Sequence, residues 1–191
     1  MIPAPAECFR LMSRYAMLDN IRDHSIVVAS IADFLAMHLM AKGHGISQPL
    51  TVAGALLHDI GKTQCLDNDD DHAKVGRDIC LTHRYEELAS IVAEHVILKN
   101  GVPSTGITEK EVVYYADKRV NHDRIVSLDE RLAYILERYG NNDERRHRAI
   151  EKNFAVCKII EEKIFAQLPC RPAEMAVAVQ RHRVSFSLEP L

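Results

Sequence analysis

The sequence predicts an all-α protein folded as a single helical bundle. Apolar residues recur at helical spacing along most of the chain, and no alternating run of β-branched residues is long enough to indicate a strand. The length of 191 residues is typical of one domain. We therefore expect one helical domain over residues 1–168, followed by a C-terminal extension or tail over residues 169–191.

Helix boundaries follow from glycine and proline. The first helix is expected after Pro5, and the second runs from about Asn20 to just before Gly43, because glycine commonly follows the last residue of a helix. A third helix opens near Pro49, and its residues 52–57 are apolar on every side, which predicts a central position. Further helices are expected over residues 72–81, 84–97, 108–121, 127–139 and 143–167, and a loose tail over residues 185–191.

Composition and charge argue against several classes of protein. No run of eighteen apolar residues is uninterrupted, so no membrane span is expected. Glu7 and Arg10 interrupt the N-terminal apolar stretch, which does not fit a signal peptide. Five scattered cysteines without a CxxC pair predict reduced thiols, and the net charge of -3 gives no strong nucleic-acid signal. We expect a cytoplasmic protein, for which a homodimer is compatible with the sequence.

Two metal-competent side chains, His58 and Asp59, end the otherwise apolar third helix. A buried carboxylate must be neutralised, paired or placed on an ion, and the adjacent imidazole favours an ion. On residue types alone, a core histidine bonded to a carboxylate is the commoner explanation. Other positions therefore have to decide between the two.

Similar donors lie on other predicted helices and could face the same interior. Asp117 interrupts an apolar and aromatic stretch, where an unpaired carboxylate would be costly. Mixed imidazole and carboxylate sites without thiolates suit divalent iron, manganese, cobalt, nickel or zinc. The further imidazoles are His24 near the start of the second helix, His72 at the start of a later one and His95 near the end of another.

The order His24, His58-Asp59, Asp117 resembles the H...HD...D signature of the HD-domain phosphohydrolase superfamily. Residues 58–61 read His-Asp-Ile-Gly, the motif of its HDIG subgroup. The motif-bearing part falls within residues 20–122, which is around half of the chain. The resemblance implies a helical bundle whose core holds one or two metal ions.

The resemblance also implies which residues bind the ions. Asp59 would bridge the first ion to a second, and His72 and His95 resemble the added ligands of the two-metal members. Some of those members have two adjacent histidines at the last position, whereas His95 is followed by Val96 in this chain. The ligands implied for the first ion are His24, His58, Asp59 and Asp117.

The expected reaction is hydrolysis of a phosphate ester or anhydride in a small nucleotide or other phosphorylated metabolite. Divalent ions lower the pKa of a bound water and polarise a phosphoryl oxygen. Asp59 and Lys62 are the expected catalytic residues, and Lys62 is also a candidate phosphate ligand, with a solvated helix-end lysine as an equal alternative. Arg77 and Arg119 are weaker candidates for further phosphate contacts. Within the family, the spaced single histidines most resemble a dinucleoside polyphosphate hydrolase.

Two other functions remain open. Some HD-like di-iron proteins are oxygenases with the same type of donor set, and a noncatalytic ligand-binding or regulatory module could keep the fold. Intact donors at all six candidate positions argue against the noncatalytic module. A second pair, His122-Asp123, lies in the polar run 119–124, which we expect to be an exposed helix end without a metal.

Overall fold

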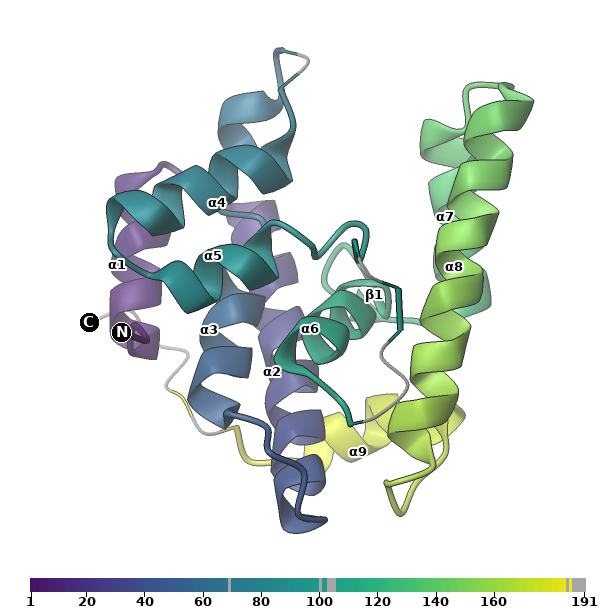
Figure 1. The fold of residues 1–191 in the computed structure, drawn as a ribbon. Helices are drawn as coiled ribbons and strands as arrows, with labels where there is room; N and C mark the ends of the chain where they lie inside the picture. Colours follow the sequence, from purple (N-terminus) through teal and green to yellow (C-terminus); the bar gives the residue numbers. More distant parts are fainter. Residues whose placement is uncertain (69, 100, 103–105, 185, 187–191) are drawn as a thin grey trace.

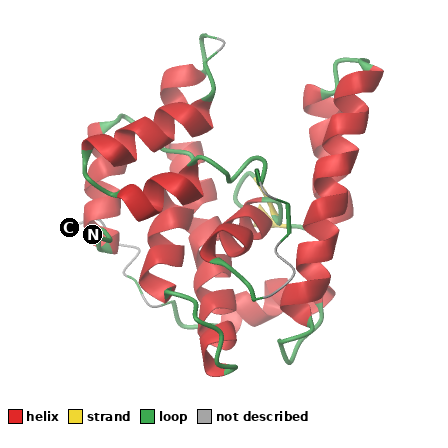
Figure 2. Ribbon diagram, in the orientation of Figure 1, coloured by secondary structure: helices red, strands yellow, loops and turns green. Residues whose placement is uncertain are grey.

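A computed structural model describes the chain except residues 69, 100, 103–105, 185 and 187–191. Nine α-helices make up most of the described residues, so the all-α expectation is confirmed (Figure 2). Short 3-10 helices cover Thr63–Cys65 and Pro172–Glu174, and one small hairpin pairs β1 (Val120–Asn121) with β2 (Arg124–Ile125). The α-helices are α1 (Pro5–Arg14), α2 (Asp19–Ala41), α3 (Gln48–Leu57), α4 (His72–Thr82), α5 (Glu86–Val92), α6 (Glu109–Asp117), α7 (Leu128–Tyr139), α8 (Glu144–Phe165) and α9 (Met175–Arg181).

Helices α2 and α3 lie side by side at the centre, and α6 packs against both (Figure 1). The α3 residues 50–57 are all buried, which agrees with the central position predicted from their apolar composition. α1 and α5 pack on α3, and α4 packs on α5. These helices, α1 to α6, surround one apolar core.

By length and composition alone, α2 is apolar enough to cross a membrane. However, 61% of its most apolar window is buried inside the protein. Its buried side chains include Val28, Ile31, Leu35 and Leu39, which belong to the core. This is the burial that the core helix of a bundle shows.

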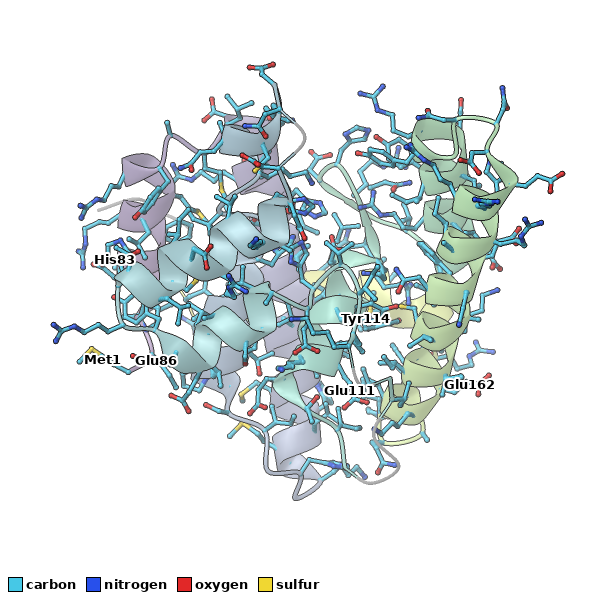
Figure 3. All side chains as sticks on the ribbon, turned by 45° about the horizontal axis from the view of Figure 1, so that its top comes forward. Met1, His83, Glu86, Glu111, Tyr114 and Glu162 are labelled. Carbon is cyan, nitrogen blue, oxygen red and sulfur yellow. The ribbon has the colours of Figure 1, made fainter. Side chains whose placement is uncertain are left out.

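Helices α7 and α8 form an antiparallel pair at one side of α6 (Figure 1). Figure 3 places Tyr114 of α6 at the boundary between the two parts, where its hydroxyl donates to the carbonyl oxygen of Asn153 on α8 at 2.7 Å. α9 packs on α2 through a segment that buries Met175 and Val179. Of the tail expected over residues 185–191, only Phe186 is described, and it is buried.

Two predicted helices are shorter than expected. The helix predicted over residues 84–97 ends at Val92, and the imidazole of His95 donates to the Val92 carbonyl oxygen, an acceptor that a longer helix would use. The helix predicted over residues 108–121 ends at Asp117. The exposed helix end expected over 119–124 is wrong: residues 120–125 form the β1–β2 hairpin, whose turn holds His122 at φ +54°.

Candidate metal centre

The ends of four helices and the side of α2 bring six donors together. The ligand atoms of His24, His58 and Asp59 lie within 4.8 Å of one another, and so do those of Asp59, His72 and His95. Asp117 joins the first group, because its Oδ1 lies 3.1 Å from His24 Nε2 and 3.7 Å from His58 Nε2. The structure therefore assembles every metal ligand that the resemblance implied into two adjoining groups.

Asp59 faces both groups with different oxygen atoms. Its Oδ2 lies 3.5 Å from His58 Nε2, whereas its Oδ1 lies 3.5 Å from both His72 Nε2 and His95 Nε2. Its side chain is only 2% exposed. This arrangement fits a carboxylate that bridges two cations, with one oxygen directed to each.

Three of the histidines are held in the tautomer that binds metals through Nε2. In each of His24, His58 and His95, Nδ1 lies at hydrogen-bond distance from a backbone carbonyl oxygen, which can only accept, so Nδ1 carries the proton. In its neutral form each ring then has its lone pair on Nε2. The 3.1 Å contact of His24 Nε2 with Asp117 Oδ1 is a hydrogen bond only when that nitrogen also carries a proton. The acceptors belong to His122, Ala55 and Val92, at 2.9, 2.7 and 2.7 Å.

His58 Nε2 is the atom whose surroundings best fit a bound cation. It is a buried polar atom without a hydrogen-bond partner among the described residues. Buried polar atoms normally have a partner, because leaving one unsatisfied costs about 1–3 kcal/mol. A lone pair that faces Asp59 and Asp117, both acceptors, fits a bound cation and no further hydrogen bond.

His72 differs from the other three imidazoles. Its side chain is 30% exposed, and its Nε2 lies 3.2 Å from His95 Nε2. Burial lowers the pKa of His72 to about 4, although the nearby Asp59 carboxylate acts in the opposite direction. His72 is therefore neutral at physiological pH, which is the form that can bind a metal.

The two carboxyl groups of the site are ionised despite their surroundings. Burial would raise the pKa of Asp59, but His58, His95 and the Lys62 ammonium together hold it well below its usual value. Burial also acts to raise the pKa of Asp117, but a hydrogen bond from His24 Nε2, which a bound cation would replace, and the charge of Lys118 hold that pKa well below its usual value. Two negative charges therefore sit next to the four imidazoles.

Gly61 explains how α4 can approach Asp59 so closely. A β-carbon on Gly61 would lie 2.6 Å from both the Gly76 amide nitrogen and the His72 carbonyl oxygen. Real β-carbons do not approach backbone atoms this closely, so only glycine lets the first turns of α4 rest on the segment after Asp59. The close packing places His72 within reach of the Asp59 carboxylate.

The three candidate phosphate ligands have different surroundings. Lys62 Nζ lies 2.7 Å from Asp59 Oδ2, and its side chain is 35% exposed. Burial acts to lower the pKa of Lys62, but the charge of Asp59 and the hydrogen bond to it raise that pKa above its usual value. Arg77 pairs with its neighbour Asp78 at 2.6 Å. Of the three, Lys62 is the one whose charged atom contacts a donor of the centre.

The prediction for Arg119 needs a correction, because its guanidinium nitrogens all donate to protein acceptors. It is buried, and it donates to the carbonyl oxygens of Val126 and Pro172, to the Tyr115 hydroxyl and to Glu161, 2.9 Å away. These contacts join α6 to α8 and to the segment before α9. Arg119 is a structural residue in this fold, and its expected contact with a substrate phosphate is not supported.

Two cations beside Asp117 were not foreseen. The buried Lys118 ammonium donates to the His95 carbonyl oxygen at 2.9 Å, lies 3.5 Å from Asp117 Oδ2 and sits 3.8 Å above the Tyr114 ring. Arg131 of α7 reaches to 3.9 Å from Asp117 Oδ1. The position of Lys118 next to Asp117 in an apolar segment was an available signal; Arg131 carried none.

Comparison with known proteins agrees with the geometry. The sequence model of the HD domain matches residues 21–182. An uncharacterized protein of Methanocaldococcus jannaschii is 26% identical over 156 residues, which cover 75% of this chain and 91% of that protein. No solved structure gives a significant match.

Two named relatives are longer proteins. A Ribonuclease Y from Treponema denticola is 30% identical over 77% of this chain, and a tRNA (cytidine(56)-2'-O)-methyltransferase from Picrophilus torridus is 29% identical over 74%. The matched regions are 28% of the Ribonuclease Y and 42% of the methyltransferase. This chain thus corresponds to less than half of either relative.

Proposed function

Because the chain belongs to the HD-domain family, we propose that it is a metal-dependent phosphohydrolase that cleaves a phosphate ester or anhydride of a small nucleotide or phosphorylated metabolite. One observation carries the proposal: a single buried carboxylate, Asp59, directs one oxygen to the Nε2 atom of His58 and the other to those of His72 and His95, each 3.5 Å away. HD-type donor sets of this composition suit divalent transition metals.

Each residue has a distinct task in this proposal. Bound divalent cations would supply a water of lowered pKa and positive charge beside the phosphoryl group. The imidazoles of His24, His58 and His95 donate from Nδ1 to backbone carbonyl oxygens, which orients Nε2 toward the carboxylates. Lys62, partly exposed beside Asp59, would bring a positive charge to a substrate phosphate.

The relatives favour one further substrate class. Ribonuclease Y, as its name states, acts on RNA, and several Ribonuclease Y proteins match this chain. Cleavage of an RNA phosphodiester would use the same donors and the same reaction type as the small-nucleotide proposal. The net charge of -3 gives the chain no general attraction for RNA, so a short RNA is the form to test.

The first experiment combines metal analysis with a phosphate-release screen. Freshly purified protein is assayed with iron, manganese, cobalt, nickel and zinc against mononucleotides, dinucleoside polyphosphates, cyclic dinucleotides and a short RNA. We expect bound transition metal and turnover of at least one phosphorylated compound. Protein that binds no transition metal and releases no phosphate with any ion would contradict the proposal, and oxygen consumption without phosphate release would favour the oxygenase.

A lysine variant separates substrate binding from metal binding. Lys62→Ala should keep wild-type metal content but raise KM or lower kcat, because it removes charge near the phosphate and leaves every metal donor in place. Lys74→Ala is the matched control, since Lys74 is exposed on α4. Loss of bound metal in Lys62→Ala would show that Lys62 supports the ligands instead of the substrate.

A further inference from the structure

Arg131 reaches the metal centre from a different part of the chain than the six donors. After Asp117, the β1–β2 hairpin turns the chain back, and α7 begins at Leu128. Ser127 and Glu130 cap the first turn of α7 in both directions, which fixes the helix where Arg131 leaves it. As a result, Arg131 Nη2 lies 3.9 Å from Asp117 Oδ1.

One edge of the Arg131 guanidinium is held, and the other is free. Nη1 donates to Asn121 Oδ1 at 2.9 Å, and the group lies 5.6 Å from the centre of the Tyr134 ring. Nε is buried and has no hydrogen-bond partner in the described part of the chain. Nη2 lies 3.9 Å from Asp117 Oδ1, which is beyond hydrogen-bond distance.

The free edge has the shape of an oxyanion site. Nε and Nη2 form the side-on fork of a guanidinium, which binds two oxygens of a phosphate or carboxylate in parallel. A buried charged donor without a partner is costly, and the side chain is only 12% exposed. A structural arginine would use this edge as Arg119 does, whose nitrogens all donate to protein acceptors.

We infer that the Nε and Nη2 edge of Arg131 binds a phosphoryl group of the substrate beside Asp117. The inference rests on the proposed function, and it adds a second phosphate ligand on α7. Lys62 contacts the Asp59 carboxylate, whereas Arg131 approaches the Asp117 carboxylate, so the two cations flank different ligands of the centre. Asn121 and Tyr134 orient the guanidinium relative to α7 and the β1–β2 hairpin, so its Nε and Nη2 edge faces away from the hydrogen bond to Asn121.

Inorganic phosphate is the probe that tests Arg131 without requiring turnover. Its dissociation constant is measured calorimetrically on the full chain after loading with manganese, for the wild type, Arg131→Gln and Arg131→Lys. Arg138→Gln is the control, because Arg138 lies on the same helix and is exposed. Bound metal and melting temperature are recorded for each protein.

We expect phosphate affinity to fall at least about tenfold in Arg131→Gln and by less in Arg131→Lys, which keeps the charge but loses the fork. Metal content should stay at the wild-type level in both, and Arg138→Gln should bind phosphate normally. Unchanged affinity in Arg131→Gln would overturn the inference, and so would loss of metal in Arg131→Lys, which would make Arg131 a positioning residue for Asp117. A metal-loaded wild type that binds no phosphate would overturn it too.

Phosphate release from esters by the wild type is scored separately. If the wild type releases phosphate and the Arg131 variants bind phosphate normally, the inference about Arg131 is wrong and the hydrolase proposal is retained. Phosphate binding that depends on Arg131, without release from any compound, refutes the hydrolase and supports the binding site. The two proposals therefore fail on different measurements.

Discussion

The helices that carry the metal donors and the helix that carries Arg131 differ strongly in burial. Twelve of the 23 residues of α2 and eight of the ten residues of α3 are buried, whereas α7 buries Leu128 alone among its 12 residues. α8, its neighbour, buries four of 22. The donors on α2 and at the end of α3 thus come from a close-packed core, and Arg131 comes from a helix pair with few buried residues.

The difference suits the two tasks. Metal ligands must keep their atoms in fixed positions, and a packed core together with carbonyl partners for Nδ1 provides this. A substrate has to enter and leave, and an element with little buried surface can move at low cost in free energy. Under the two proposals above, the core would hold the metal ions, and α7 would contribute to substrate binding.

The largest effect is expected at the residue shared by both groups. Asp59→Ala should abolish metal binding and phosphohydrolase activity together, because each group loses the carboxylate oxygen directed to it. Metal per chain, measured by elemental analysis, tests this. The control is His122→Ala, which keeps the backbone carbonyl that His24 uses and should retain metal and activity. Wild-type metal content in Asp59→Ala would disprove the bridging role.

Hydrogen exchange tests the contrast in burial directly. Amides of α7 should exchange at least about a hundredfold faster than those in the middle of α2, because local opening of α7 exposes little apolar surface. Mass spectrometry of peptides from both helices provides the rates. Equal protection of the α2 and α7 amides from exchange would show that α7 opens no more easily than the core, which would contradict the proposed difference between the two regions.

The two metal groups should also differ from each other. His72 is the most exposed ligand, and no backbone carbonyl bonded to its Nδ1 is found in the described residues, unlike the other three imidazoles. We expect a chelator to remove metal in two phases, with the ion near His72 lost about tenfold faster. His72→Ala should remove the fast phase only, and His83→Ala, at the other end of α4, should leave both. A single phase in the wild type would refute two unequal sites.

Sequence analysis reached the helical fold and the donor set for separate physical reasons. Periodicity shows where apolar faces lie, which is why the central position of α3 was predictable. Helix ends were less accessible, since the end of α5 depends on a side chain, His95, that takes a backbone acceptor. That the six donors hold metal ions remains a prediction; their convergence in space is what the structure adds.

Contacts across the hairpin could not be read from the sequence. β1 and β2 have two residues each, too few for an alternating pattern, and without the turn nothing brings Arg131 back to Asp117. The carbonyl of His122 holds His24 through the same turn, although the His122 side chain itself is exposed. The sequence prediction considered only the side chain of His122, whereas the contact with His24 is made by the His122 backbone carbonyl oxygen.

The smallest predicted effect concerns the glycine of the His-Asp-Ile-Gly motif. Gly61→Ala should lower stability by about 1–3 kcal/mol, because the added methyl group pushes α4 away from the segment after Asp59. For a chain of this size, this corresponds to a melting temperature lower by roughly 2–12 °C, measurable by calorimetry. His72 moves with α4, so the ion near His72 should bind more weakly, whereas the affinity of the His24 group for its ion should not change. Gly45→Ala is the control, since its β-carbon would meet open space. If Gly61→Ala instead weakened the binding of both ions equally, the contact between Gly61 and α4 would not support the His72 group alone, and it would not explain a difference between the two metal groups.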